Sequence, residues 1–530
     1  MATVSESPEA ILVGGKWKAA AATQLFQASN PATVEALPAK YPISSWEDCE
    51  QVLEAATSAA SQLRKLPSGQ IADFLDAFAA QLDSHVAELA ELANLETALP
   101  IKPRLADVEL PRTSGQLRQA AAAARTGSWA HPTIDTKLGI RSCYEPIGPV
   151  IVFGPNNFPF AFNSVAGGDF AAAIAAGNPV IGKANTSHPG TTKRLAELAQ
   201  QAAEQTGLPA ATVQLIYRVS HADGEKFVAD PRVGAIGYTG SRTAGLKLKA
   251  AADAAGKPIY LELSSVNPVI MLPGAIAERG QALVDEFVGS VLMGTGQFCT
   301  NPGLILAIDG HETQAFIQGV VDKFSSNAPG TLLSNAVQTS LTAAIQTLVN
   351  AGAELLCGGE AIPGKCSVAN TLLRVPAAKF LQDPEVFQTE AFGNASLVVV
   401  ADNIAEIADA IAALEGNLTG SIYSAQDGND EEAYAAVGPL LATRVGRLMN
   451  DKMPTGVAVS PAMNHGGPYP ATGHPGFTAV GIPASLLRFG KLTCYDAVRQ
   501  HRLPSLLQDK NLTQNTWRLV DGNWSTADIG

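Results

Sequence analysis

The sequence predicts an α/β protein with two lobes, each built on a parallel sheet with helices on both faces. From about residue 147, short apolar runs such as IGPVIVFGP, NPVIGKA and VGAIGYTG alternate with alanine-rich helical stretches. A second series begins near residue 283 with the helical stretch ALVDEFVGSVLMGTG and the apolar run LILAID. A chain of 530 residues is also too long for one small core. We therefore expect two lobes with their seam around residues 268–280.

Other elements follow from local patterns. Residues 50–95 carry apolar positions at helical spacing, which predicts surface helices with one buried face. Residues 136–148, TKLGIRSCYEPIG, alternate polar and apolar side chains and predict a hairpin outside the first sheet. In the second lobe we expect a helix at TQAFIQGVVDKF and strands near 396–400 and 420–424. The tail after about residue 490 has no α/β pattern of its own, and we expect it to pack against a partner subunit.

Composition and charge exclude several classes of function. The net charge of −13 argues against a nucleic-acid partner. The start, MATVSESPEA, lacks the basic region and apolar run of a secretory signal. The longest apolar-looking stretch, residues 170–181, is too short to span a bilayer, so no membrane partner is expected. Six scattered cysteines favour a reducing, cytoplasmic location over a disulfide framework.

The histidines do not predict a metal site. The chain has eight of them, and they form no cluster with metal-ligand spacing. His465 in MNHGG and His474 in TGHPG stand in glycine-rich loops. We expect both side chains to be exposed to solvent.

Cys299 is the strongest candidate for chemistry. It lies in GTGQFCTNPG, between a helical stretch and a loop bounded by glycine and proline, where a turn can present the thiol to a substrate. A thiol with a pKa of about 8.5 is mostly protonated at neutral pH, so a nucleophilic cysteine needs a base or a positive local field. Taken alone, the pattern also fits a buried cysteine with a packing role, which is our expectation for the other five cysteines.

Two polar residues that follow apolar strands could assist such a thiol. Glu262 ends the apolar run in YLELSSVNP, and ligand sites of open α/β sheets lie beyond the carboxyl ends of their strands. Its carboxylate could accept the thiol proton or activate a water molecule. Asn157 in VFGPNNFPFAF offers a neutral amide donor for a developing oxyanion. Alone, Glu262 also fits an ion-paired or capping glutamate, and Asn157 an ordinary turn residue.

Three further stretches suit a phosphate-containing cofactor. Lys183 in VIGKANTSHPG ends a strand and offers a compact positive charge. Gly240 and Gly245 in GYTGSRTAG stand at a strand-to-helix turn, where backbone N–H groups bind phosphate. In TEAFGNAS, Glu390 could take ribose hydroxyls and Phe392 could support a flat cofactor ring. Each of these motifs is weak on its own.

The order of these residues is more specific than any one of them. Along the chain they are Asn157, Lys183, Gly240–Gly245, Glu262, Cys299 and Glu390 with Phe392. This succession resembles the aldehyde dehydrogenase superfamily, and the resemblance runs from ILVGGKW to HGGPYPATGHPGFTAVG. GQFCTNPG and HGGPYPAT resemble a branch that contains 2-oxoglutarate semialdehyde (2,5-dioxopentanoate) dehydrogenases and NADP-dependent fatty-aldehyde dehydrogenases. Ser264 and Ser265 depart from the usual Gly-Gly after the glutamate, and Val266 from the lysine that often follows.

The resemblance implies a mechanism of aldehyde oxidation. Cys299 would attack the aldehyde to form a thiohemiacetal, whose oxyanion the Asn157 amide and the Cys299 backbone N–H would hold. Transfer of a hydride to the nicotinamide would leave a thioester, and Glu262 would activate the water that hydrolyses it.

It also implies the cofactor site. Lys183 would reach the adenosine ribose, Ser241 the pyrophosphate and Glu390 the nicotinamide ribose, with Phe392 beside that ribose. The family's aldehyde dehydrogenase-like fold has three parts. Residues 1–135 and 149–270 would form the cofactor-binding domain, and 271–480 the catalytic domain. Residues 136–148 and 481–530 would form an oligomerisation hairpin and C-terminal tail, and a homodimer or homotetramer is expected.

Thr186 bears on the choice of cofactor. Many family members have a glutamate at this position, three residues after the cofactor lysine, which binds the ribose 2′-OH and repels a 2′-phosphate. The short neutral hydroxyl of Thr186 removes that repulsion. Lys183 and Arg218 could then meet the phosphate. We expect NADP to be accepted and preferred, with NAD also possible.

The substrate is suggested by a segment rich in arginine. A semialdehyde with a distant carboxylate needs a cation in the tunnel, and RLADVELPRTSGQLRQ carries Arg104, Arg112 and Arg118. Alignment of GQLRQ with the helix that lines the family's tunnel points Arg112 inward, while a surface position remains open for all three arginines. Phe158 and Ala161 are expected to form the opposite wall.

We expect an NAD(P)-dependent dehydrogenase that oxidises 2-oxoglutarate semialdehyde to 2-oxoglutarate. The alternative is a broad-specificity or medium- to long-chain NADP-dependent aldehyde dehydrogenase with the same mechanism. A binding protein that keeps the fold without turnover is a further class, disfavoured because thiol, base, amide donor and cofactor lysine are all retained. A coenzyme-A-acylating enzyme is disfavoured by Glu262, which that branch typically lacks.

Overall fold

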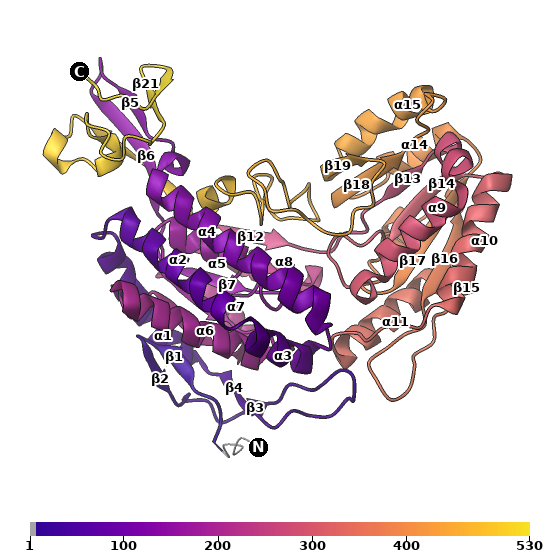
Figure 1. The fold of residues 1–530 in the computed structure, drawn as a ribbon, viewed down its shortest axis with the longest axis horizontal. Helices are drawn as coiled ribbons and strands as arrows, with labels where there is room; N and C mark the ends of the chain where they lie inside the picture. Colours follow the sequence, from indigo (N-terminus) through magenta and orange to yellow (C-terminus); the bar gives the residue numbers. More distant parts are fainter. Residues whose placement is uncertain (1–6) are drawn as a thin grey trace.

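The computed structural model describes residues 7–530 and contains two α/β lobes side by side, with a small sheet projecting from the first lobe (Figure 1). Each lobe is built on a seven-stranded sheet, as the two series of apolar runs predict. None of the helices in this range is both long and apolar enough to cross a bilayer.

The sheet of the first lobe has the strand order β12-β11-β7-β8-β9-β1-β2. Its strands are β1 (Ile11–Val13), β2 (Lys16–Lys18), β7 (Val150–Phe153), β8 (Val180–Lys183), β9 (Val213–Ile216), β11 (Ala235–Thr239) and β12 (Ile259–Glu262). The five strands from β12 to β9 are parallel, and β1 joins β9 in antiparallel register. β7 and β9 are buried along their whole length, because helices cover both faces of the sheet.

The helices of this lobe include those expected over residues 50–95. They are α1 (Trp46–Leu63), α2 (Ser68–Ser84), α3 (Val86–Thr97), the π-helix η1 (Ile101–Glu109), α4 (Leu110–Thr126), η2 (Ser128–Ala130), α5 (Gly168–Ala175), α6 (Pro189–Thr206), α7 (His221–Ala229) and α8 (Arg242–Ala254). A capping box between Ser45 and Asp48 fixes the start of α1. Helix α4 ends at Gly127, whose left-handed conformation suits a residue without a Cβ.

The second lobe has the strand order β15-β16-β17-β14-β13-β18-β19, with only β15 antiparallel. Its strands are β13 (Val269–Met271), β14 (Leu304–Ile308), β15 (Glu354–Cys357), β16 (Thr371–Pro376), β17 (Ala395–Ala401), β18 (Asn417–Tyr423) and β19 (Val445–Asn450). Its helices are α9 (Pro273–Leu292), η3 (Met293–Gly296), α10 (His311–Ser326), α11 (Asn335–Asn350), α12 (Ala377–Phe380), α13 (Pro384–Phe387), α14 (Ile404–Ala412) and α15 (Glu431–Ala442). The chain changes sheets between Glu262 and Val269, so a boundary after residue 270 falls inside β13.

Two smaller sheets complete the fold. β3 (Leu25–Phe26), β4 (Tyr41–Ser44) and β10 (Arg218–Val219) form one, in the order β10-β4-β3. The other has the order β20-β6-β5-β21-β22 and contains β5 (Thr133–Asp135), β6 (Ile140–Pro146), β20 (Gly490–Asp496), β21 (Arg518–Val520) and β22 (Asn523–Ser525). The short 3-10 helices η4 (Ala484–Phe489), η5 (Gln500–Arg502) and η6 (Ser505–Leu507) flank β20. The hairpin expected over 136–148 is observed over residues 133–146, because β5 precedes the expected range and only β6 lies within it. The C-terminal tail pairs with this hairpin outside the first sheet.

A long segment returns from the second lobe to the first. Residues 451–483, which we call the return segment, cross the space between the lobes (Figure 1). The N–H of Leu263 donates to the carbonyl of Ala471 at 2.8 Å, and the N–H of Gly473 donates to the carbonyl of Leu261 at 3.1 Å. The return segment is thereby fixed against the end of β12, where Glu262 lies.

Candidate active site

Glu262, Cys299 and Asn157 line one cavity of about 650 Å³ between the lobes. Glu262 ends β12 and is almost completely buried. Cys299 follows the 3-10 turn η3, where Gly294, Thr295 and Gly296 take left-handed φ angles of 55°, 58° and 69°. These angles end the helical path of α9 and turn the chain so that the thiol reaches the cavity. The cavity is of the size that binds cofactors and other small ligands.

His465 of the return segment joins this site, and the expectation that it is exposed is wrong. Its Nε2 lies 2.8 Å from Oε1 of Glu262 and 3.3 Å from Sγ of Cys299, and the side chain is 1% exposed. The backbone holds the residue on both sides: its N–H donates to Oγ1 of Thr478, and its carbonyl accepts from the N–H of Ala479. The glycine-rich loop is buried because it pairs with β12. His474, on the same segment, is exposed as expected.

The same nitrogen of His465 faces two acidic groups. An N–H can bond to only one of them at full strength, so it can pair with the Glu262 carboxylate or with a Cys299 thiolate. Burial, followed by the charge of Glu262, holds the pKa of the Cys299 thiol well above its ordinary value, while Arg112 acts in the opposite direction. The resting thiol is therefore protonated, and its ionisation depends on nearby donors.

Asn267 holds the turn that carries Cys299. Its Nδ2 donates to the carbonyls of Cys299 and Asn301, each at 2.9 Å. The residue has a left-handed φ of 47°, a conformation that asparagine tolerates better than most residues. Oδ1 of Asn417 accepts the backbone N–H groups of Val266 and Asn267. The turn after β12 is thus fastened both to the nucleophile and to β18.

The Asn157 amide is oriented by the same turn. Its Nδ2 donates to the carbonyl of Gln297 at 3.0 Å, which leaves its second N–H free to face the cavity. Glu109, fully buried, accepts the backbone N–H groups of Phe160 and Ala161 and pairs with Arg104. Arg104 in turn donates to the carbonyl of Asn157 at 3.1 Å. A buried ion pair therefore fixes the loop that carries the amide.

Arg112 on helix α4 lies close enough to Cys299 for its charge to act on the thiol. Its Nε donates to Oε1 of Gln116 at 3.0 Å, while its buried Nη2 has no hydrogen-bond partner among the described residues. The guanidinium lies 5.3 Å from the Phe162 ring and 5.8 Å from the Phe158 ring. Burial lowers the pKa of Arg112, and the nearby acids Glu109, Cys299 and Glu262 act in the opposite direction. A buried cation with an unused donor is suited to bind an anionic ligand.

The other arginines of this segment have different surroundings. The guanidinium of Arg104 lies 4.5 Å from the ring centre of Phe158 and 5.4 Å from that of Phe298. It also forms a salt bridge with Glu109. Arg118 is exposed and pairs with Asp83 on the surface. Sequence reasoning missed Arg447 on β19, whose charge also acts on Cys299. A lone arginine in the strand run VGRLMN carries no sequence signal for such a role.

Apolar side chains surround the thiol on the side of Arg112. Phe158 and Phe298 pack edge to face at 5.5 Å, and Phe158 and Phe162 at 5.2 Å. The buried cluster also contains Ala161, Phe477, Ala479 and Val480. Phe158 and Ala161 therefore belong to one buried apolar cluster, and their place in a substrate tunnel stays a prediction.

Most of the expected cofactor residues line two adjoining cavities. Thr186, Arg218, Gly240 and Ser241 line both the 650 Å³ cavity and a second one of about 640 Å³, which Lys183 also lines. Burial, and then the charge of Arg218, lower the pKa of Lys183 to about 8. Two cations so placed repel each other and would be stabilised by an anion between them.

The N-terminus of α8 opens onto these cavities. Ser241 is its N-cap residue, and no side chain caps the helix there. The free N–H groups of a helix N-terminus suit phosphate. Gly245, in contrast, lines neither cavity, and its expected part in phosphate binding stays a prediction. A Cβ at Gly245 would lie 2.5 Å from Leu263 and 2.9 Å from Tyr238, so the glycine instead lets α8 pack closely on the sheet.

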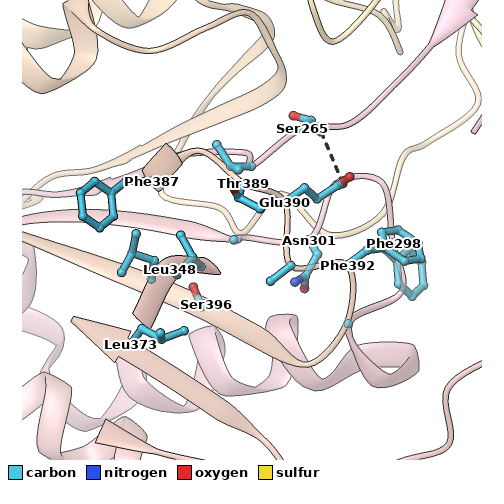
Figure 2. A pocket seen from close by; sticks show the side chains of 15 residues that line it. Ser265, Phe298, Asn301, Leu348, Leu373, Phe387, Thr389, Glu390, Phe392 and Ser396 are labelled. Carbon is cyan, nitrogen blue, oxygen red and sulfur yellow. Dashed lines mark hydrogen bonds between the residues drawn. The ribbon is translucent and has the colours of Figure 1, made fainter. Parts of the chain in front are cut away.

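Glu390 and Phe392 reach the 650 Å³ cavity from the loop before β17. Figure 2 shows Glu390 directed at Ser265, whose N–H donates to Oε1 at 3.4 Å. Burial raises the pKa of Glu390 to about 7, although hydrogen bonds from Ser264 and Ser265 act to lower it. The hollow beside these residues in Figure 2 measures only about 20 Å³, room for about one water molecule. The ligand space is thus the larger cavity on the side of Cys299.

Comparisons with known proteins agree with this geometry. Residues 17–467 match the model of the aldehyde dehydrogenase family. A relative named alpha-ketoglutaric semialdehyde dehydrogenase 2, from Azospirillum brasilense, is 37% identical over 514 residues, which cover 94% of this chain and 96% of the relative. Alpha-ketoglutaric semialdehyde dehydrogenase from Acinetobacter baylyi is 35% identical and covers 93% and 96%. An indole-3-acetaldehyde dehydrogenase solved in complex with NAD+ has the same fold, with a TM-score of 0.77, 21% identity and coverage of 93% and 97%.

Proposed function

The chain belongs to the aldehyde dehydrogenase family of oxidoreductases, and on that premise we propose that it oxidises 2-oxoglutarate semialdehyde to 2-oxoglutarate. The observation that carries the choice of substrate is the half-buried side chain of Arg112, whose buried Nη2 has no partner among the described residues. A carboxylate at the far end of the aldehyde would supply that partner by a charge-assisted hydrogen bond. The names of the two relatives above support the same substrate.

The chemistry follows from the groups around Cys299. Its thiolate attacks the aldehyde carbon, and the free N–H of Asn157 stabilises the oxyanion that forms. The thiol proton passes to solvent in the cavity. His465 aids this ionisation, because its Nε2–H can turn from the Glu262 carboxylate to the new thiolate. Loss of a hydride leaves a thioester on Cys299. Glu262, whose buried Oε2 has no hydrogen-bond partner in residues 7–530, then removes a proton from the water that hydrolyses the thioester.

The adjoining cavities fit a nicotinamide dinucleotide, which supplies the hydride acceptor when bound. Ser241 at the open N-terminus of α8 would hold the pyrophosphate, and Glu390 with Phe392 the nicotinamide ribose. We propose NADP as the preferred form, with NAD accepted. The support is the pair of mutually repelling cations Lys183 and Arg218 beside the neutral Thr186.

The second candidate is an aldehyde dehydrogenase for neutral, medium-length substrates. The observation that favours it is the apolar cluster that contains Phe158, Phe162, Phe298 and Phe477. An alkyl chain could pack against these rings as well as a semialdehyde could. The two candidates share every chemical step and differ only in what Arg112 contributes.

Initial rates of cofactor reduction separate them. We expect kcat/KM for 2-oxoglutarate semialdehyde to exceed that for hexanal by about a hundredfold, or about 2.7 kcal/mol of transition-state binding. Parallel assays with NADP and NAD test the cofactor. Equal rates, or a preference for hexanal, would support the second candidate.

We also propose a cytoplasmic, homo-oligomeric enzyme whose only other partners are its small substrates. All six cysteines lie within the described residues and are free thiols, which supports a reducing compartment. The five-stranded sheet formed by β5, β6 and the tail supports an oligomer. It projects from the first lobe (Figure 1), and it exposes large apolar side chains.

A further inference from the structure

We propose that Cys299, Glu262 and His465 form a Zn²⁺ site, through which zinc reversibly blocks the nucleophile. One donor atom from each residue lies within 4.8 Å of the other two. The donors are a sulfur, an imidazole nitrogen and a carboxylate oxygen, which is a ligand set that zinc favours. The sequence gives no sign of this set, because its members come from β12, the turn after η3 and the return segment.

The distances need only small adjustments. Tetrahedral zinc with ordinary bond lengths separates a sulfur and a nitrogen ligand by about 3.5 Å, and a nitrogen and an oxygen ligand by about 3.4 Å. In the structure, Nε2 of His465 lies 3.3 Å from Sγ of Cys299 and 2.8 Å from Oε1 of Glu262. The first contact must open by about 0.2 Å and the second by about 0.6 Å to reach the separations that zinc prefers. The sulfur and the carboxylate oxygen lie within 4.8 Å of each other.

Glu262 provides an independent indication of a missing ligand. Its side chain is 1% exposed, and its Oε2 forms no hydrogen bond within residues 7–530. A buried carboxylate oxygen without a partner is costly, and a cation would satisfy it. Glu262 and Cys299 both line the 650 Å³ cavity, which offers an entrance and room for a water molecule as the fourth ligand.

The charges around the three ligands are compatible with a bound Zn²⁺ ion. Zinc displaces the proton of the Cys299 thiol, which passes to solvent. The proton on Nε2 of His465 moves to Nδ1, so that neutral imidazole binds the ion, and no electron is transferred. The thiolate and the Glu262 carboxylate then offset the two positive charges of the ion. Arg112 and Arg447 are the nearby cations that act on Cys299, and Glu390 is a further nearby acid. The bound ion occupies both the sulfur that attacks the aldehyde and the carboxylate that activates water, so inhibition should compete with aldehyde and be reversed by a chelator.

Direct binding of Zn²⁺ to the full-length protein tests the proposal without reference to any aldehyde. Isothermal titration with zinc chloride should give one strong site per chain. Cys299→Ser, Glu262→Gln and His465→Asn should each weaken that site by a hundredfold or more. Two matched controls are Cys494→Ser, which removes an exposed thiol on β20, and His474→Asn, which removes an exposed histidine of the return segment. Both should bind zinc like the parent protein. Unchanged zinc affinity in the three ligand variants, or its loss in a control, would overturn the proposal.

Two measurements cover the case in which a ligand variant does not fold. Zinc should protect Cys299 from iodoacetamide in the parent protein and in His474→Asn, with the alkylated residue located by peptide mass. Cobalt(II) in place of zinc should give a thiolate-to-metal charge-transfer band that saturates at one ion per chain. Unprotected alkylation of Cys299 at saturating zinc, or a cobalt complex without that band, would equally refute the site.

Discussion

Arg112 is the residue on which the choice of substrate depends. Charge-assisted hydrogen bonds are worth about 1.5–3 kcal/mol, and the unpartnered Nη2 has one to offer. We expect Arg112→Ala to raise KM for 2-oxoglutarate semialdehyde by about 10- to 100-fold and to change that for hexanal little. Arg118→Ala, which removes an exposed arginine of the same helix, is the control. An equal loss with both aldehydes would mean that Arg112 only supports the fold.

Thr186 is the residue on which the proposed preference for NADP over NAD depends. A glutamate here would place a negative charge beside Lys183 and Arg218 and would repel a 2′-phosphate. We expect Thr186→Glu to weaken NADP binding by about 10- to 100-fold and to leave NAD unchanged or tighter, measured by fluorescence titration of the reduced cofactors. Thr186→Gln adds similar bulk without charge and should keep the NADP preference. Unchanged discrimination in Thr186→Glu would contradict this role.

His465 should control how readily Cys299 ionises. The pKa of the Cys299 thiol is already raised by burial and by Glu262. Removing the Nε2–H donor in His465→Asn should raise that pKa further. Alkylation of Cys299 by iodoacetamide at pH 7 should then slow by about tenfold or more, with the alkaline rise of the rate displaced to higher pH. His474→Asn should follow the parent profile, and the same profile in His465→Asn would exclude the role.

At the scale of single residues, the sequence predicts what lies in short motifs. Cys299, Glu262 and Asn157 follow strands or turns whose local pattern is readable, and the structure brings them to one cavity. His465 could not be found in this way, because the glycine and proline around it resemble an exposed loop. Its burial results from pairing with β12, some two hundred residues earlier. The motif HGGPYPAT was visible, but its chemical meaning depends on that contact.

At the scale of elements, the turn between β12 and β13 holds the loop of Cys299 in place through hydrogen bonds from Asn267. Asn267→Gly keeps the left-handed backbone but deletes the amide that binds the carbonyls of Cys299 and Asn301. We expect a loss of about 1–3 kcal/mol in stability together with a fall in kcat of about 10-fold or more, and little change in cofactor affinity.

Asn394→Ala is the matched control for that loss. Asn394 is a buried amide whose Nδ2 donates to the carbonyl of Val368 and to Oδ1 of Asn370. Its replacement should cost similar stability, measured by urea unfolding, without the fall in kcat. If both variants lose kcat in proportion to their loss of stability, Asn267 does not position Cys299.

The elements themselves were largely predictable because their patterns are local. Apolar runs bounded by turn residues became β7, β8, β11 and β14, and the helical spacing over residues 50–95 became α1 to α3. The sequence does not show the return segment, since its hydrogen bonds to Leu261 and Leu263 join residues far apart in the chain. The C-terminal strands were not predicted for the same reason. β20 pairs with β6, and β21 pairs with β5, and both partners lie far away in the sequence.

At the scale of the whole molecule, the two-lobed architecture places the active site between the lobes. The first sheet supplies Glu262, the second lobe Cys299 and Glu390, and the return segment His465. Length and the two series of strands predict two lobes, whereas their closure over one cavity depends on long-range contacts. The projecting five-stranded sheet takes no part in this cavity, so its exposed apolar surface needs another explanation.

That surface should join subunits. Leu492 on β20 and Trp524 on β22 are 63% and 56% exposed, although large apolar side chains are usually covered in a stable assembly. We expect light scattering after gel filtration to give the mass of a dimer or tetramer of the 54.9 kDa chain, and Leu492→Asp with Trp524→Asp to reduce that mass. Leu355→Asp with Leu440→Asp, which alters exposed leucines of the second lobe, should leave it unchanged. A monomeric parent protein, or a mass that only the control pair reduces, would show that the projecting sheet is not the interface.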